Sequence, residues 1–514
     1  MTNGGGNPAL VCRKIKNKQA DDADGGLSTA CGGGNPALTT EKDRKMSENV
    51  KENPLGCEAV GKLMVKFAVP SIIAMLVGAL YNIIDQLFIG QAVGLLGNSA
   101  TNVAFPFSTS CIALALLFGI GGASCFNLAM GKGETEKAPL FIGNSITMLT
   151  ICGVILSAIT LVFLTPLLRL FGSPDDVLPY AQDYVQISAF GFPFLIVSTG
   201  GGHLIRADGS PRMTMFLNLI GAVINTILDA VFVLGLGWEM KGAALATIIG
   251  QIVSAVIVIA YLFRFKTVKL SLRHFKINLR VTLRIASIGM ASFFNQIAMM
   301  IVQIVLNNSL KDYGALSVYG DAIPLACAGI VMKVNQVIFS VVIGLGQGSQ
   351  PIESFNYGAR KYDRVRKAYM LALGIAAAIS VASFVAYQLF PREILALFGS
   401  DEPEIYFEFG ERFFRIFLLL VPLVCIQPVT ATFFTSIGKP IKGIFLSLTR
   451  QIIFFLPLLI VLPLFFGIDG ILYTGPVADL ISAVIAVLMA MFEFKAMRKL
   501  ENSLPKSDKL IEKQ

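Results

Sequence analysis

Two aspartates, Asp85 and Asp229, stand inside stretches of sequence that are otherwise apolar and long enough to cross a bilayer. An ionised carboxylate at the centre of a bilayer costs at least about 2.5 kcal/mol. Such a group must therefore face the protein interior or a watery cavity, pair with a cation, or carry a proton. These two residues are the first candidates for a proton or Na⁺ site.

Polar side chains accompany both aspartates on the same helix face. Tyr81 and Asn82 precede Asp85 by four and three residues, and Asn225 precedes Asp229 by four. Counted from the basic residues at the inner ends of their helices, Asp85 lies ~28 Å and Asp229 ~26 Å along the helix axis. At this matched depth the two carboxyls could share one proton or ligate one Na⁺. The alternative is a pair of buried carboxylates that are hydrogen-bonded for packing alone.

The rest of the chain supplies the helices that must position these groups. Hydrophobic residues make up 54% of the 514 residues and charged ones only 15%, and the mean hydropathy is +0.69. These values indicate an all-α membrane protein. Twelve apolar runs have the length of a membrane span: 62–90, 102–129, 139–166, 183–206, 212–236, 242–264, 284–310, 316–348, 368–390, 412–436, 441–466 and 470–494.

Lysine and arginine set the expected orientation, because they are retained on the cytoplasmic side. They are concentrated in the even-numbered loops, above all in the long basic connection 264–284. Both termini are therefore expected in the cytoplasm. The net charge of +9 is explained by these loops and the Lys-rich end of the chain, so it requires no nucleic-acid partner.

Several kinds of chemistry find no support in the sequence. The eight cysteines have no C-x-x-C spacing, and His203 and His274 are the only histidines, so a metal centre is not expected. The chain has no G-x-x-x-x-G-K-[ST] motif for ATP and no H-E-x-x-H motif. We expect a protein without cofactors that is not an enzyme.

The two halves of the membrane region repeat each other in the same direction. GIGGASCFNLAMGKG at 119–133 matches GLGQGSQPIESFNYG at 344–358, FGSPDD at 171 matches FGSDEP at 398, and RADGSP at 206 matches TSIGKP at 435. Three pairs in order at nearly constant spacing indicate a duplicated six-helix unit, an arrangement typical of transporters. The expected parts are a disordered polar extension with a repeated GGGNPAL (1–46), an N-lobe (47–264), a cytoplasmic linker (265–283), a C-lobe (284–498) and a cytoplasmic tail (499–514).

The sequence resembles the multidrug and toxic compound extrusion (MATE) family, close to its MepA-like bacterial branch. The resemblance covers roughly residues 50 to 500. It is carried by PSIIAMLVGALYNIIDQLFIGQAVG with TNVAFPF, by RADGSPRMTMFLNLIGAVINTILDAVFV, and by QPIESFNYGARKYDRVRKA in the second half. It implies a V-shaped bundle of six plus six helices that exports amphipathic cations in exchange for H⁺ or Na⁺.

The resemblance also implies roles for particular residues. Asp85, Asn225 and Asp229 match the positions that couple the cation in the N-lobe. Pro70 would allow helix 1 to bend, although a kink that serves packing alone fits equally well. Some members also use a Glu in helix 7 and an Asp in helix 10, where this chain has Asn295 and Gln427. This departure favours a mechanism based on the N-lobe.

Weaker candidates lie in the second half. Lys333, near the middle of helix 8 beside Asn335, would line the central cavity or need a partner. Gln296 and Gln303 are candidate cavity-lining groups or interhelical contacts. Arg450 and Asp479 lie at similar depth, and we expect them to form a structural ion pair.

We therefore expect a monomeric multidrug antiporter in a bacterial cytoplasmic membrane. Its partners would be drugs or organic cations, H⁺ or Na⁺, and the lipid bilayer. The alternative is a flippase or an exporter of a specialised lipid-linked or metabolite substrate on the same architecture. A flippase that grips pyrophosphate would favour a cavity rich in Arg and Lys, and Lys333 and Arg450 are few for that purpose.

Overall fold

The computed structural model describes residues 53–320, 322–397 and 403–503, and all elements in these ranges are helical. The expected extension 1–46 lies outside the described residues. The first half contains α3 (Pro54–Cys57), α4 (Val60–Ala92), α5 (Leu95–Gly131), α6 (Ala138–Val162), α7 (Leu164–Leu170), α8 (Leu178–Ala207), α9 (Pro211–Asp229), the π-helical turn η1 (Ala230–Gly235) and α10 (Glu239–Leu262). We call this half the N-lobe.

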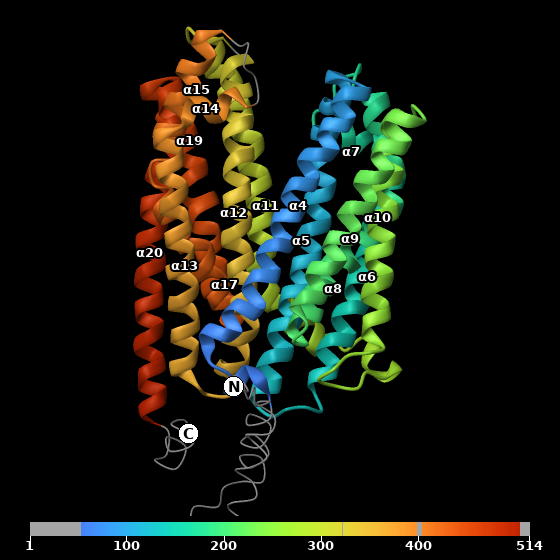
Figure 1. The fold of residues 1–514 in the computed structure, drawn as a ribbon, viewed down its shortest axis with the longest axis vertical. Helices are drawn as coiled ribbons and strands as arrows, with labels where there is room; N and C mark the ends of the chain where they lie inside the picture. The colour runs from blue at the N-terminus through green and yellow to red at the C-terminus, as the bar shows by residue number, and fades with distance from the viewer. Residues whose placement is uncertain (1–52, 321, 398–402, 504–514) are drawn as a thin grey trace, which may run out of the picture. The chain divides into compact units, whose positions relative to one another are not determined.

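A short 3₁₀ helix, η2 (Leu272–Phe275), lies in the linker. The second half, which we call the C-lobe, contains α11 (Leu279–Ala315), α12 (Ala322–Gly358), α13 (Tyr362–Leu389), α14 (Pro391–Ala396), α15 (Glu404–Phe417), α16 (Val421–Val424), α17 (Ile426–Ser436), α18 (Pro440–Leu448), the π-helical turn η3 (Thr449–Phe455), α19 (Leu456–Phe466) and α20 (Ile468–Asn502). Figure 1 shows these helices running roughly side by side.

Among the described residues, eleven helices are long and apolar enough to cross a membrane. A twelfth span forms if α15 is joined to α16 and α17 across a bend of 46°. The expected all-α membrane fold is confirmed, and the apolar run expected as a span at 412–436 is a bent pair of helices. Pro422 stands at the start of α16, and a proline there cannot donate the hydrogen bond that would continue the preceding helix.

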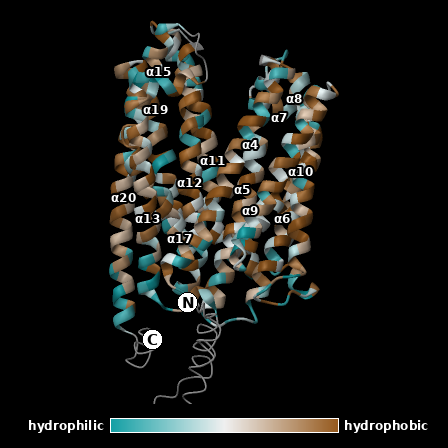
Figure 2. Cartoon of the chain, viewed as in Figure 1, coloured by the Kyte–Doolittle hydropathy of each residue, from teal (hydrophilic) through white to brown (hydrophobic). Residues whose placement is uncertain are grey.

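Many large apolar residues of the helices are exposed, and Figure 2 shows hydrophobic residues (brown) along most of the length of the helices. Val65, Val162 and Phe492 are all more than 60% exposed. A lipid environment removes the cost of exposing such residues, because hydrocarbon is as apolar as they are.

The two lobes pack against each other near the end of the bundle where α4 begins and α20 ends, which we call the terminal end (bottom of Figure 1). Here α5 lies against α11, and α12 lies against α4 and α5. The contact is between backbones: a Cβ on Gly121 would collide with the carbonyl oxygen of Ile285, and one on Gly358 with that of Leu128. The glycines of the repeated motif therefore allow the lobes to close at this end.

The linker is fastened to the N-lobe by two polar side chains. The carboxylate of Asp208 accepts hydrogen bonds from the backbone N–H of Lys266 (2.8 Å) and from the Tyr261 hydroxyl (2.7 Å). Asn144 accepts one from the backbone N–H of Asn278 (2.8 Å). The connection between the lobes is thus held at both of its ends.

Candidate functional site

Asp85 and Asp229 meet inside the N-lobe. Asp85 on α4 is 8% exposed, and Asp229, the last residue of α9, is fully buried. Their carboxyl groups lie within hydrogen-bonding reach of each other. Two ionised carboxylates can only accept hydrogen bonds, so they cannot satisfy one another. One shared proton, or one cation between them, would make the contact favourable.

Three of the four carboxylate oxygens lack a hydrogen-bond donor. In the part of the chain that the structure describes, neither oxygen of Asp229 nor Oδ1 of Asp85 has a partner. Buried polar atoms are usually paired, because leaving one unpaired costs about 1–3 kcal/mol. The pair is therefore arranged as an acceptor set for a positive charge.

Further oxygen atoms surround the pair. The Asn225 amide donates to the Thr247 hydroxyl on α10 (3.2 Å), while its own carbonyl oxygen has no donor among the described residues. The hydroxyls of Tyr81 and Tyr184 also lie within reach of Thr247. Carboxylate, amide and hydroxyl oxygens are the ligands that hard cations prefer. The cluster can hold H⁺ or Na⁺.

Local backbone features bring these residues together. A Cβ on Gly250 would lie 2.8 Å from the carbonyl oxygen of Gly221, so α9 and α10 approach closely one turn before Asn225. Directly after Asp229, the helix changes to the π-helical turn η1. Such turns occur often at functional sites, because they interrupt the regular hydrogen-bond ladder.

The sequence did not reveal all members of this cluster. Tyr184 and Thr247 come from α8 and α10, and their proximity depends on how those helices pack, which local spacing does not report. Asn82 was expected beside Asp85 on one helix face, but it is exposed and its amide donates to the carbonyl of Gly78 (2.8 Å). The amide of Asn82 is therefore bonded within its own helix.

The polar candidates of the C-lobe make local hydrogen bonds. The Gln427 amide donates to the carbonyl of Leu446 (2.9 Å) and joins α17 to α18. The Gln303 amide donates to Asn307 (3.0 Å). The Asn295 amide faces the Met299 sulfur at 3.7 Å, Gln296 is half-buried and Lys333 is exposed.

Arg450 and Asp479 form the expected ion pair, with Nε and Oδ1 2.6 Å apart. The Arg450 guanidinium also lies over the rings of Phe339 and Phe455 at 5.9 and 5.8 Å. This geometry is that of a structural pair, because both charges are compensated in place.

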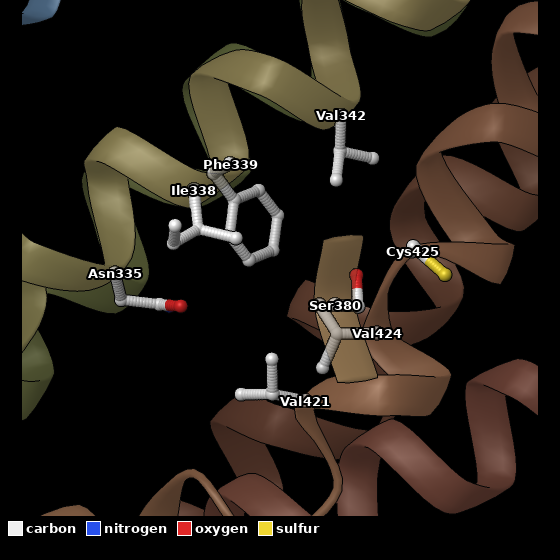
Figure 3. A pocket seen from close by; sticks show the side chains of 8 residues that line it. All are labelled: Asn335, Ile338, Phe339, Val342, Ser380, Val421, Val424 and Cys425. Atoms are coloured by element: carbon white, nitrogen blue, oxygen red, sulfur yellow. The ribbon is translucent and has the colours of Figure 1, made fainter. Parts of the chain in front are cut away.

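Among the described residues, cavities also occur outside the aspartate cluster. A small one of ≈ 10 Å³, lined by Asn335, Ser380 and apolar residues, is shown in Figure 3 and has room for about one water molecule. A larger one of ≈ 590 Å³ lies at the terminal end and is lined by Lys132, Arg284, Lys439 and Tyr357, among others. Its size is that of a small-molecule site.

Comparison with known proteins finds one family and several relatives. The family described as MatE matches residues 70–231 and 292–461, one range in each lobe. Multidrug export protein MepA of Staphylococcus haemolyticus is 25% identical over 442 residues, covering 84% of this chain and 93% of the relative. An FAD transporter of Shewanella oneidensis is 24% identical over 442 residues, covering 84% and 94%.

Solved structures share the fold. An outward-facing conformation of a multidrug resistance MATE family transporter of the MOP superfamily superposes with a TM-score of 0.80 at 22% identity, covering 88% of this chain and 98% of that one. A MATE structure in a bent conformation gives 0.78 at 22% identity, covering 90% and 100%.

Proposed function

Because the chain belongs to the MatE family, whose members are transporters and not enzymes, we propose that it is a secondary active multidrug exporter. It exchanges amphipathic organic cations for H⁺ or Na⁺ across a bacterial cytoplasmic membrane, with the terminal end in the cytoplasm. The observation that carries this proposal is the buried contact between Asp85 and Asp229, which lacks donors for three of its oxygens.

Alternating access explains how cation binding at the aspartate pair drives export of the drug. The two lobes close at the terminal end through glycine contacts, and alternating access requires a second state in which that end is open. A cation shifts the balance between two states only if it binds one of them better. Binding at the aspartate pair changes the N-lobe and weakens its hold on the drug, so drug and cation compete reciprocally.

The test uses proteoliposomes with H⁺ and Na⁺ gradients imposed separately. In a one-for-one exchange of a monovalent drug cation for H⁺ or Na⁺ no net charge crosses the membrane, so each tenfold gradient of the coupling cation, worth about 1.4 kcal/mol, supports a roughly tenfold drug gradient. Asp85→Asn and Asp229→Asn should reduce the accumulation ratio to about one. Asp183→Asn is the matched control, because Asp183 is a partly exposed acid of the same lobe, paired with Lys241 at 3.5 Å.

Two results decide the outcome. Loss of accumulation in both site variants, with normal accumulation in the Asp183 control, supports coupling at the pair. Full accumulation in either site variant at equal protein level places the coupling site elsewhere.

One observation favours a second substrate class. Lys132, directly after α5, and Arg284 on α11 line the ≈ 590 Å³ cavity together with Lys439. Such a basic site suits a phosphate-bearing molecule, and one relative is described as an FAD transporter. Competition between FAD and an organic cation for transport in the same proteoliposomes distinguishes the two classes.

A further inference from the structure

A third buried acid lies outside the aspartate cluster, in the other lobe. Glu353 on α12 is 0% exposed, and neither of its carboxyl oxygens has a hydrogen-bond partner in the described residues. No ion pair reaches it from those residues. An ionised carboxylate in such surroundings is costly unless it is used.

The side chains around Glu353 can accept hydrogen bonds but have none left to donate. Ser349 and Ser436 lie within hydrogen-bonding reach of the carboxyl. However, the Ser349 hydroxyl donates to the carbonyl of Gly346 (2.9 Å), and that of Ser436 donates to the carbonyl of Thr432 (2.8 Å). Each hydroxyl has a single hydrogen. With both hydroxyls donating to backbone carbonyls, a neutral carboxylic acid, which has an O–H to donate, fits this site better than a carboxylate.

The other helices around this stretch bring no compensating charge. From α13, Tyr369 is the titratable neighbour, and its hydroxyl is paired with the Thr430 hydroxyl (2.8 Å). Thr430 already donates to the carbonyl of Ile426, so Tyr369 is the donor in that pair. From α5, Ser124 faces α12 and accepts from the Gln350 amide (2.8 Å). The described contacts therefore leave a proton as the partner of Glu353.

The position of Glu353 links this proton to the closure of the lobes. Its helix α12 is tied to α17 by the Ser354 hydroxyl, which donates to the carbonyl of Ser436 (2.8 Å). The same stretch of α12 carries Gly348 and Gly358, whose backbones touch α4 and α5. A change in how α12 fits against α17 therefore reaches the lobe interface directly.

We propose that Glu353 is a second proton-binding site, and that a proton held there between α12 and α17 favours the closed terminal end. When the carboxylic acid releases its proton to the cytoplasm, the carboxylate that remains needs water or donors. It gains them when α17 moves away from α12 and the terminal end opens. The inference rests on the proposed alternating access and is independent of coupling at Asp85 and Asp229.

The experiment measures the opening of the terminal end as a function of pH. Spin labels at Lys137→Cys in the N-lobe and Arg498→Cys in the C-lobe, both exposed positions, report distances in an otherwise cysteine-free protein. The labelled protein also carries Asp85→Asn and Asp229→Asn, so that the aspartate pair cannot titrate. Release of one proton on opening changes the ratio of open to closed protein by up to about tenfold per pH unit.

Glu353→Gln in this background should remove the pH dependence and keep the terminal end closed, because the Gln amide can donate to a serine hydroxyl as the acid does. Glu493→Gln is the matched control. Glu493 is equally buried but is paired with Lys439 and with Lys442 (2.8 Å). It should leave the pH dependence in place.

An unchanged pH dependence in Glu353→Gln, or its absence in the parent protein, overturns the proposal. If Glu353→Gln does not fold, Ser436→Ala retains the carboxyl and removes one acceptor. Ser436→Ala should lower the fraction of protein with a closed terminal end at pH 5, and an unaltered fraction would also overturn the proposal. Failure of the coupling proposal has a different signature, namely accumulation that survives in Asp85→Asn.

Discussion

Gly348 offers the sharpest test of closure at the terminal end. It lies on α12, and a Cβ there would be 2.5 Å from the Cα of Ala68 and 2.8 Å from its backbone nitrogen on α4. Ordinary contacts of a Cβ begin at 3.4 Å, so α4 and α12 would have to separate by roughly 1 Å to accept Gly348→Ala. The atoms in the way are backbone atoms, which no change of side-chain rotamer can move.

The magnitude follows from the cost of overpacking, which is typically about 1–3 kcal/mol. Only the state in which α4 and α12 touch here bears this cost. The ratio of closed to open protein should therefore fall by about 5- to 150-fold. The gain of about 1 kcal/mol in helix propensity from Gly to Ala is the same in both states and cancels.

Gly329→Ala is the matched control on the same helix, because no atom lies within 4 Å of the added Cβ. Distance measurements with the labels at Lys137 and Arg498 should show opening in Gly348→Ala and no shift in Gly329→Ala. Equal distance distributions in the two variants would refute closure through this contact. Reduced export in Gly348→Ala alone is the expected consequence in cells.

Two further predictions concern the linker and the ion pair of the C-lobe. Asp208→Ala removes the side chain that holds the linker, and each lost hydrogen bond should reduce the stability of the bound linker by about 1 kcal/mol. Tryptic cleavage within 264–284 should therefore become faster, and an unchanged rate would speak against the anchoring role. Asp479→Ala leaves Arg450 buried without its partner and should cost about 3–5 kcal/mol. Thermal unfolding in detergent checks this, and the double change Arg450→Met with Asp479→Leu should restore most of the stability.

The aspartate pair was predictable because depth along a helix depends only on the rise per residue. Counting residues from the inner ends of two helices placed Asp85 and Asp229 at one level, and the structure brings their carboxyls together. Counting cannot tell which faces of α8 and α10 turn toward them. Thr247 joins the cluster through the rotation of α10, which is packed closely against α9 at Gly221 and Gly250, and Tyr184 joins it through the packing of α8 against α10 at Gly191.

Glu353 could not be found in the same way. The predicted span ended at 348, so this acid fell in what we expected to be a polar connection, where a glutamate is unremarked. In the structure α12 continues to Gly358, because that end of the helix is buried against α4 and α5 instead of facing water. A local hydropathy window does not register burial by another part of the chain.

Pro70 lies in α4 between the start of the helix and the part that carries Asp85. It lies in α4 between Ala68 and Ile72, whose backbones meet Gly348 and Gly344 of α12. Proline removes one hydrogen bond from the helix ladder, so bending costs least at this point. Because α4 touches α12 on both sides of Pro70, a bend here would change the contact of Ile72 with Gly344 and move the part of α4 that carries Asp85. Cation binding at the aspartate pair would then act, through α4, on the same lobe contact that we propose Glu353 to control.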